Sequence, residues 1–263
     1  MANQFTHALV VGHPGHELRA FHWMELHRPV VCVITDGSGQ LGVPRTDSTH
    51  AVLAAAGATA GPIFAPLADR DLYAALLARD TGRFLALAEA LAETLSSAGV
   101  LTVAGDAAEG FNPTHDLCRI LLDAVVERCA TTGRGSIENL AFALDGRPDA
   151  IPSGVPADAV TRLDLDAGAL SRKLAAARGY PEMRHEVEAA VARFGEASFA
   201  VENFWRPAAS RGGDADGSGH ERPFYERHGE SRVAAGMYRE AVRAAEHVRP
   251  IAQALRRWAG AAP

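Results

Sequence analysis

Short, unbroken runs of apolar residues recur along this chain, separated by polar segments. The clearest are residues 7–12, 29–34 and 100–103, which are rich in valine. Such runs are typical of strands buried on both faces of a parallel sheet, because an exposed face would bring polar residues to alternate positions. Segments with helical periodicity lie between them. We therefore expect an α/β fold with a doubly wound, mostly parallel sheet and helices on both faces.

The first two strands enclose residues 17–27, which fit a short crossover helix and complete a right-handed βαβ unit. Another helix is expected in the segment that begins at His115, where apolar residues recur at helical spacing. The remaining expected elements are strands at 62–66, 140–144, 160–165 and 198–205, and helices at 46–56, 69–98 with a break near Asp80, 168–178 and 182–194.

A long helix is expected near the end of the chain, over about residues 230–258. Its apolar positions alternate at spacings of four and three, which predicts an apolar seam along one side. We expect the seam to pack on the chain's own sheet; the alternative is a second copy, which would make the protein a homo-oligomer. The positions are Met237, Ala241, Ala244, Val248, Ile251, Leu255 and Trp258.

Residues 1–263 are expected to form one α/β domain, with a flexible loop at 207–222 and a C-terminal helical segment at 223–258. The loop is rich in glycine, serine and aspartate, a composition typical of mobile segments. Our hypothesis is that it forms a lid or specificity loop. A solvated linker without a role is the alternative.

Composition narrows the classes of function. The formal net charge is −6 and Lys173 is the sole lysine, which argues against nucleic-acid binding. No stretch approaches the roughly 20 apolar residues of a membrane span, and the N-terminus lacks a basic region followed by an apolar run. Three cysteines without CxxC spacing indicate buried thiols in a reducing compartment. We expect a cytoplasmic protein that acts on a small molecule.

Candidate chemistry follows the first strand. His13 and His16 lie three residues apart with Glu17 beside them, where the strand ends and a helix begins. Open α/β sheets place their ligands at the carboxyl ends of the strands. Because two histidines at this spacing suit a metal ion, we expect a metal site here. His115 occupies a comparable position after the later strand at 100–103.

Residues 12–17 (Gly-His-Pro-Gly-His-Glu) and 111–116 (Phe-Asn-Pro-Thr-His-Asp) together resemble the PIG-L/LmbE-like family of zinc-dependent deacetylases. Members carry an AHPDDE-type motif near the N-terminus and an HPDH-type motif after a later strand. Residues 34–37 are similar to the family's TDG turn, and residues 201–204 to its late Glu-x-Phe element. The similarity spans most of residues 6 to 205.

The resemblance implies an LmbE-like fold and a hydrolase that cleaves the amide of an N-acyl amino sugar or a related small metabolite, in a biosynthetic pathway. It also implies one divalent metal ion per chain, most simply zinc. Carried over position by position, the ligands are His13, His16 and His115.

This chain departs from the family pattern at the residues that move protons. Gly15 stands where the family has its aspartate base, and His16 stands where it has a ligand aspartate. Asn112 replaces the first histidine of the later motif and Thr114 its aspartate. The family base and its histidine partner therefore have no counterpart. A rival hypothesis follows, in which a divergent member binds a small metabolite or catalyses a different reaction in the same pocket.

Proton transfer would then fall to a substitute. We rank Glu17 first, then Asp36 and Asp116, because each adjoins a motif at a strand end. A carboxylate at position 17 would equally be favoured by the positive end of its own helix. Residues 223–230 combine aromatic, acidic and imidazole groups, and we expect them to close over the pocket with His228 as a replacement acid. A helix cap is the alternative for that segment.

Four further residues are candidates for substrate binding. Arg45 would contact a polar substrate group or cap its loop, and Tyr225 would face the substrate. Glu202 lies inside an apolar strand, where it would contact the substrate or support a ligand histidine; a buried ion pair is the alternative. Asn112 completes the set.

The glycine-rich loop Gly37-Ser38-Gly39-Gln40-Leu41-Gly42 formally contains G-x-G-x-x-G. A dinucleotide site requires this pattern to open a helix, whereas Val43 and Pro44 follow here. We therefore interpret the segment as a loop that borders the pocket. A nucleotide-binding oxidoreductase is the remaining alternative.

Overall fold

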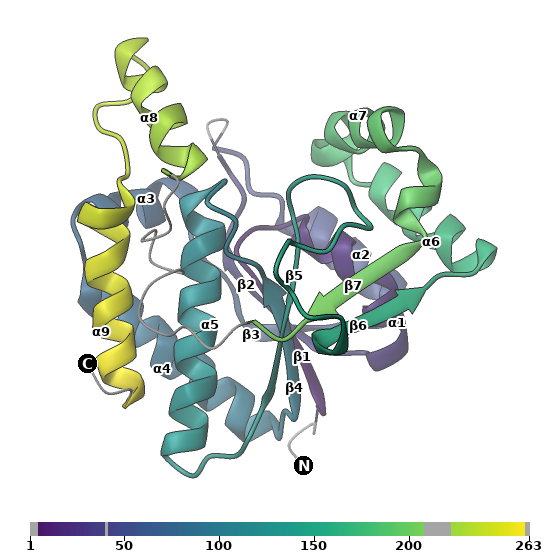
Figure 1. Ribbon diagram of the computed structural model, residues 1–263, viewed down its shortest axis with the longest axis horizontal. Helices are drawn as coiled ribbons and strands as arrows, with labels where there is room; N and C mark the ends of the chain where they lie inside the picture. The colour runs from purple at the N-terminus through teal and green to yellow at the C-terminus, as the bar shows by residue number, and fades with distance from the viewer. Residues whose placement is uncertain (1–4, 40–41, 208–221, 261–263) are drawn as a thin grey trace.

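The computed structural model describes residues 5–39, 42–207 and 222–260. Its centre is a seven-stranded sheet in the order β3-β2-β1-β4-β5-β7-β6 (Figure 1). Neighbouring strands from β3 to β5 run parallel, and β7 runs antiparallel to both β5 and β6. The mostly parallel α/β sheet predicted from the sequence is confirmed.

The strands are β1 (His7–Val11), β2 (Val30–Thr35), β3 (Thr59–Leu67), β4 (Thr102–Asp106), β5 (Glu138–Phe142), β6 (Val160–Asp164) and β7 (Val201–Trp205). The α-helices are α1 (Phe21–His27), α2 (Thr46–Ala56), α3 (Asp69–Leu77), α4 (Thr81–Ala98), α5 (Pro113–Thr131), α6 (Ala167–Arg178), α7 (Arg184–Phe194), α8 (Phe224–Ala234) and α9 (Arg249–Ala259). Short 3₁₀ segments lie at His16–Ala20, Ala157–Ala159, Pro181–Met183 and Glu196–Phe199, and a π-helical turn at Ala244–Val248.

Helices cover the sheet on both faces (Figure 1). Alternate residues of β1 point to opposite faces: Ala8 and Val10 pack with α4, α5 and α9, and Leu9 and Val11 pack with α1, α2 and α7. All four side chains are fully buried. This two-sided burial explains why the parallel strands read as continuous apolar runs in the sequence.

One glycine of β4 allows the sheet and α5 to approach closely. A Cβ atom at Gly105 would lie 2.6 Å from Leu122 Cδ2 and 2.7 Å from the carbonyl oxygen of Val10. Any side chain here would push α5 away from the adjoining strands β1 and β4. Gly105 therefore helps to bring the first turn of α5, and His115 with it, to the ends of these strands.

Most of the expected elements are present. The break predicted near Asp80 separates α3 from α4, and the Asp80 side chain accepts a hydrogen bond from the backbone N–H of Arg83 at the start of α4. All three cysteines are free and buried, as predicted. No helix in the described part of the chain is long and apolar enough to cross a membrane.

The prediction of one long C-terminal helix is wrong. The segment forms α8, a non-helical stretch, the π-helical turn and α9. Gly236, which follows the end of α8, has φ +70°, a left-handed conformation that does not continue a helix, and Pro250 lies in the first turn of α9, where its missing N–H is tolerated. In α9, Ile251 and Leu255 are buried against the core, so this part of the seam does pack on the chain's own structure.

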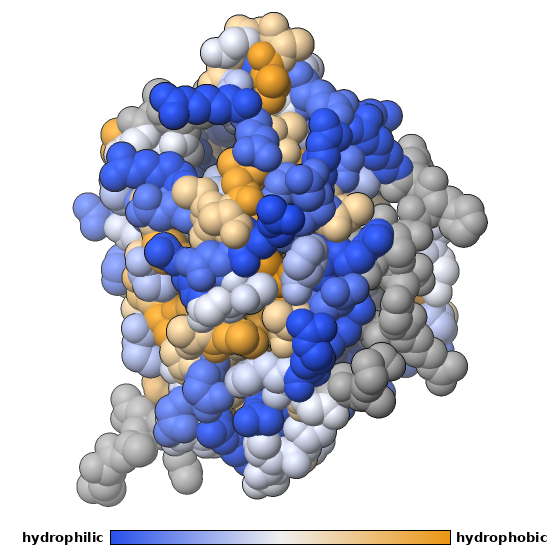
Figure 2. All heavy atoms as spheres, turned by 90° about the vertical axis from the view of Figure 1, so that its left-hand side faces the viewer, coloured by the Kyte–Doolittle hydropathy of each residue, from blue (hydrophilic) through white to orange (hydrophobic). Residues whose placement is uncertain are grey.

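Charged and polar side chains cover much of the face that carries α8 and α9, with small apolar areas between them (Figure 2). The expected flexible loop at 207–222 falls almost entirely outside the described residues. Its proposed function as a lid stays a prediction.

A buried ion pair links β7 to the start of α1. Glu202 accepts hydrogen bonds from the backbone N–H groups of His22 and Trp23, at 2.9 and 2.8 Å, and from Lys173 Nζ at 2.8 Å. The carboxylate thus satisfies two free N–H groups in the first turn of α1. Both partners of the pair are buried, so neither charge can be solvated if the other is removed.

We expect Lys173→Met to lower the free energy of unfolding by about 3–5 kcal/mol, because it leaves the Glu202 carboxylate buried without its cation. Arg172→Met is the matched control. Arg172 pairs with Glu25 at the surface, so its loss should cost about 0–1 kcal/mol. Urea denaturation of both variants measures the difference; equal costs would contradict a structural role for the buried pair.

Candidate metal centre

Three histidines gather at the carboxyl ends of β1 and β4. His13 lies in the turn after β1, His16 begins the following 3₁₀ segment, and His115 lies in the first turn of α5. The ring centroids of His13 and His16 are 5.2 Å apart, those of His13 and His115 are 5.5 Å apart, and those of His16 and His115 are 4.5 Å apart. The structure therefore brings together the three residues that the resemblance implied as metal ligands.

Local sequence fixes the position of His115. Asn112 caps α5: its side-chain oxygen accepts a hydrogen bond from the backbone N–H of Thr114 at 2.8 Å. Pro113 occupies the first position of the helix, where a missing N–H costs nothing. The cap begins the helix directly after the loop from β4, so that the first turn carries the imidazole of His115 to the sheet edge.

Hydrogen bonds hold His13 in one tautomer. Its Nδ1 lies 2.7 Å from Thr35 Oγ1 and 3.1 Å from Asp69 Oδ1. The Thr35 hydroxyl donates to the carbonyl oxygen of Gly12 at 3.0 Å, so its oxygen accepts from Nδ1–H of His13. The Nε2 atom of His13 then carries a free lone pair. It is buried and has no hydrogen-bond partner among the described residues.

His16 is held in the same way by a different carboxylate. Its Nδ1–H donates to Asp106 Oδ2 at 2.8 Å, and the same oxygen accepts from the backbone N–H of Gly12 at 2.7 Å. Burial lowers the pKa of His16, although Asp106 opposes this shift. Histidines that bind metal ions are commonly oriented through their second nitrogen in this manner.

His115 completes the group of three imidazoles. Burial, and then the neighbouring His16 and His13, hold the pKa of His115 well below its ordinary value. Its Nδ1 is buried without a partner among the described residues. Because a metal ion binds only deprotonated imidazole nitrogen, this low pKa favours binding.

The donor set therefore fits a metal ion in its chemistry. Three neutral imidazoles form an established ligand set for catalytic zinc, which leaves a fourth position open. The spacing is wider than that of a closed site. In the described part of the chain, the ligand atoms of the three histidines do not all lie within 4.8 Å of one another, whereas those of another group of three residues do. The three histidines can therefore bind one ion together only if their imidazole rings move closer to a common point.

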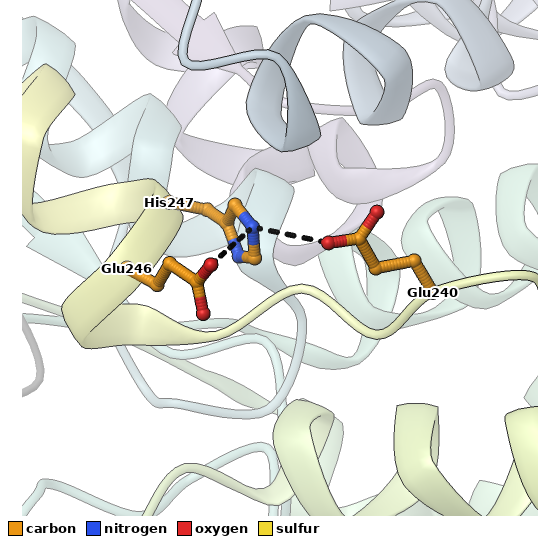
Figure 3. Close-up of side chains that lie close together, drawn as sticks. All are labelled: Glu240, Glu246 and His247. Atoms are coloured by element: carbon orange, nitrogen blue, oxygen red, sulfur yellow. Dashed lines mark ion pairs between the residues drawn. The ribbon is translucent and has the colours of Figure 1, made fainter.

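The compact group is Glu240, Glu246 and His247 (Figure 3). His247 Nδ1 accepts a hydrogen bond from the backbone N–H of Arg243 at 2.9 Å, so the ring proton of the neutral imidazole lies on Nε2. Nε2 faces the two carboxylates at 3.6 and 3.8 Å. A metal ion would need a lone pair at Nε2, where the ring proton lies, so this group is poorly suited to metal binding.

Glu17 adjoins the three histidines but is completely buried. Its Oε2 accepts a hydrogen bond from the backbone N–H of Gly15 at 2.7 Å, which stabilises the turn that carries His16. Oε1 is buried without a partner among the described residues. Burial raises the pKa of Glu17 to about 7, so its proton exchanges near neutral pH.

The two other candidate carboxylates bind backbone groups. Asp36 accepts hydrogen bonds from Ser38 and from the backbone N–H of Asp69. Asp116 accepts from the backbone N–H groups of Glu109 and Gly110, at 2.9 and 3.0 Å, and burial raises its pKa to about 6. Both therefore shape the loops that border the histidines.

The start of α8 is divided between core and surface. Tyr225 is buried in the core, and burial raises its pKa above the ordinary range. His228 is exposed and stacks on Phe224, with ring centroids 5.6 Å apart. The structure thus exposes His228 to solvent, whereas Tyr225 packs in the core.

The remaining candidates for substrate binding occupy different positions. Arg45 is half-buried, and its Nη1 lies 3.2 Å from Met183 Sδ, beside the Gly15 turn. Asn112 uses its side-chain oxygen to cap α5. Glu202 is bound within the buried ion pair described above, which is the alternative that the sequence left open.

Two residues of the site were missed in the sequence. Asp69 orients His13 and Asp106 orients His16. Burial alone would raise the pKa of Asp69, but hydrogen bonds with His13, Thr35 and the Gly39 N–H lower it. Their positions in the chain could have indicated this role. Asp106 ends β4 and Asp69 begins the helix after β3, both at the carboxyl edge of the sheet.

The position of the family base is closed to a side chain. Gly15 has φ +103°, a conformation that L-residues rarely adopt, and a Cβ atom there would lie 3.3 Å from Met183 Cγ and Sδ. A side chain here would therefore require a strained backbone and a shift of Met183. The absence of an aspartate is accommodated by the surrounding structure.

No family model and no curated protein matches the chain. Two solved structures share its fold. A conserved protein of Thermus thermophilus, TT1542, is 15% identical with a TM-score of 0.54, over 78% of this chain and 96% of that one. The A40926 pseudoaglycone deacetylase Dbv21 is 14% identical with a TM-score of 0.50, over 80% of this chain and 100% of that one. At these identities the likeness shows the fold alone.

We expect Gly15→Asp to destabilise the protein by about 1–3 kcal/mol, because it combines a strained φ with contact against Met183. Gly99→Asp is the control for backbone strain alone, since Gly99 has φ +74° with no atom within 4 Å of an added Cβ. Adding Met183→Ala should recover part of the loss at position 15. Thermal denaturation compares the variants; a Gly15→Asp protein as stable as the wild type would contradict the account.

Proposed function

We propose that this protein is a metal-dependent hydrolase that cleaves the amide of an N-acyl amino sugar or a related small metabolite. The observation that carries the proposal is the group of three histidines at the carboxyl ends of β1 and β4. The motif resemblance to PIG-L/LmbE-like deacetylases and the fold shared with Dbv21, named as a deacetylase, support it.

The residues that would hold the ion are His13, His16 and His115. A bound zinc ion would supply Lewis acidity for an acyl carbonyl and would make a water molecule easier to deprotonate. The chain's own contribution is orientation. Asp69 and Thr35 fix the tautomer of His13, and Asp106 fixes that of His16.

The charge balance differs from that of a site with a carboxylate ligand. The ligand expected from the resemblance is aspartate, whereas this chain has the neutral His16, with the Asp106 carboxylate directly behind it. The negative charge of Asp106 thus contacts His16 and does not itself occupy a ligand position. We propose that this arrangement retains affinity for the metal and leaves the ion more electrophilic than a carboxylate ligand would.

Within the proposal, Glu17 is the first candidate for proton transfer. Its carboxyl group lies beneath the turn between the two motif histidines and has a pKa of about 7. A group with this pKa can both accept and release a proton at neutral pH.

A second function is favoured by one specific observation, the closed base position at Gly15. An added side chain at position 15 would meet Met183, and this is compatible with a protein that binds a metabolite without hydrolysing it. In that case the protein would still bind metal but would show no amidase activity. The two functions are separated by measuring metal content and hydrolysis on the same sample.

We expect His115→Ala to reduce bound zinc from about one ion per chain to well below one and to abolish hydrolysis, because two imidazoles bind the ion far more weakly than three. His185→Ala, on the exposed surface of α7, is the control and should keep its zinc. Elemental analysis of protein without a histidine tag gives the metal content. Unchanged zinc in His115→Ala would contradict the ligand set.

We expect Glu17→Gln to lower kcat by about 10²–10⁴-fold while zinc content is unchanged, because the amide cannot transfer protons. The amide oxygen can still accept the hydrogen bond from the Gly15 N–H, so the turn should be retained. Asp116→Asn is the comparison, since its carboxylate binds a loop. Equal turnover in Glu17→Gln and the wild type would remove Glu17 from proton transfer.

A further inference from the structure

Two exposed phenylalanines lie against each other beside the three histidines. Phe111 is 42% exposed and Phe224 is 44% exposed. Their ring centroids are 5.1 Å apart and their planes differ by 5°. They come from separate segments, the loop between β4 and α5 and the first position of α8. Large exposed aromatic side chains are costly in water, so a contiguous pair next to a candidate site indicates a ligand surface.

The pair belongs to a longer row of rings. Phe111 lies 6.4 Å from the ring of His115 on the inner side, and Phe224 lies 5.6 Å from the ring of His228 on the outer side. The planes of these neighbours differ by 34° and 27°. We call the row His115, Phe111, Phe224 and His228 the aromatic ladder. It leads from the candidate metal centre to the exposed side of α8.

The outer part of the ladder is held in place by the fold. The backbone N–H of Tyr225 donates to the carbonyl oxygen of Gly110 at 3.3 Å, next to Phe111 in the sequence. Tyr225 itself is buried in the core, and Glu226 accepts a hydrogen bond from the backbone N–H of Ala244 at 2.7 Å. These contacts fix the start of α8 to the loop that carries Phe111. The ladder is therefore a built surface.

The stacking decides which chemical group the ladder can bind. Phe111 and Phe224 stack on each other with nearly parallel planes, and each has a histidine ring as a second neighbour, so one face of each phenylalanine is already used in stacking. A flat aromatic or sugar ring needs a free face for stacking. The exposed part of the two phenylalanines forms a narrow apolar strip, and an extended alkyl chain is the group that covers such a strip along its length.

We propose that the aromatic ladder binds the alkyl chain of the substrate's acyl group, so that the substrate class is N-acyl amines with a straight chain longer than acetyl. The inference rests on the proposed hydrolase function. The acyl carbonyl lies at the three histidines and the chain runs over Phe111 towards Phe224. Water adds to the acyl carbon and the C–N bond breaks. The products are the fatty carboxylic acid, which carries the water's hydroxyl, and the free amine, which takes a proton.

Chain-length dependence tests the proposal. The probes are N-acetyl-, N-hexanoyl- and N-octanoyl-glucosamine with the zinc-loaded wild type. Each methylene group that becomes half-covered should raise kcat/KM by about twofold. Phe111→Ala and Phe224→Ala should reduce the ratio of octanoyl to acetyl kcat/KM at least severalfold. Leu26→Ala, 54% exposed on α1, is the control and should keep the wild-type ratio.

A binding measurement separates this inference from the proposed function. Calorimetry with metal-free protein should show tighter binding of N-octanoyl- than of N-acetyl-glucosamine, and the difference should be lost in both phenylalanine variants. That result without any hydrolysis would support the ladder and overturn the hydrolase. Hydrolysis with equal kcat/KM for all three probes would overturn the ladder alone. The absence of both binding and hydrolysis would overturn both proposals. Circular dichroism confirms that each variant is folded.

Discussion

The arrangement of the candidate site depends on one buried carboxylate, that of Asp106. Its Oδ2 accepts hydrogen bonds from the backbone N–H of Gly12 and from Nδ1 of His16, and so joins the end of β4 to the turn after β1. These strands pair in parallel at the centre of the sheet, where the strand order reverses. Such a position opens the crevice in which doubly wound folds bind ligands. Without this contact the tautomer of His16 would not be fixed.

Much of the fold could be predicted because its cause is local. Burial on both faces makes β1, β2 and β4 continuous apolar runs, and the Asn112 cap with Pro113 marks the start of α5 in the sequence itself. The same local signals predicted that His13, His16 and His115 end up at one sheet edge. The long C-terminal helix was mispredicted because Met237 and Ala241 keep the apolar spacing of the later helix although they lie in a non-helical stretch. Periodicity alone does not register the left-handed backbone of Gly236 that precedes them.

The residues that orient the histidines could not be predicted in the same way. Asp69 and Asp106 are distant from their partners in the sequence, and only the pairing of the strands brings them together. Glu202 shows the reverse: its place in an apolar strand suggested a site residue, yet Lys173 and the first turn of α1 fully account for it. A buried charge in a strand therefore indicates that the charge has a partner. The sequence does not show whether this partner is a bound ligand or another residue of the chain.

The central claim is that three imidazoles share one metal ion. Zinc-edge X-ray absorption of the zinc-loaded protein tests it most directly, because the number of imidazole ligands and their Zn–N distances are read from the ion itself. The account predicts three imidazole nitrogens at about 2.0–2.1 Å and a further light-atom ligand. A spectrum with fewer than three imidazoles would contradict it, and ligation by carboxylates alone would place the ion outside the three histidines.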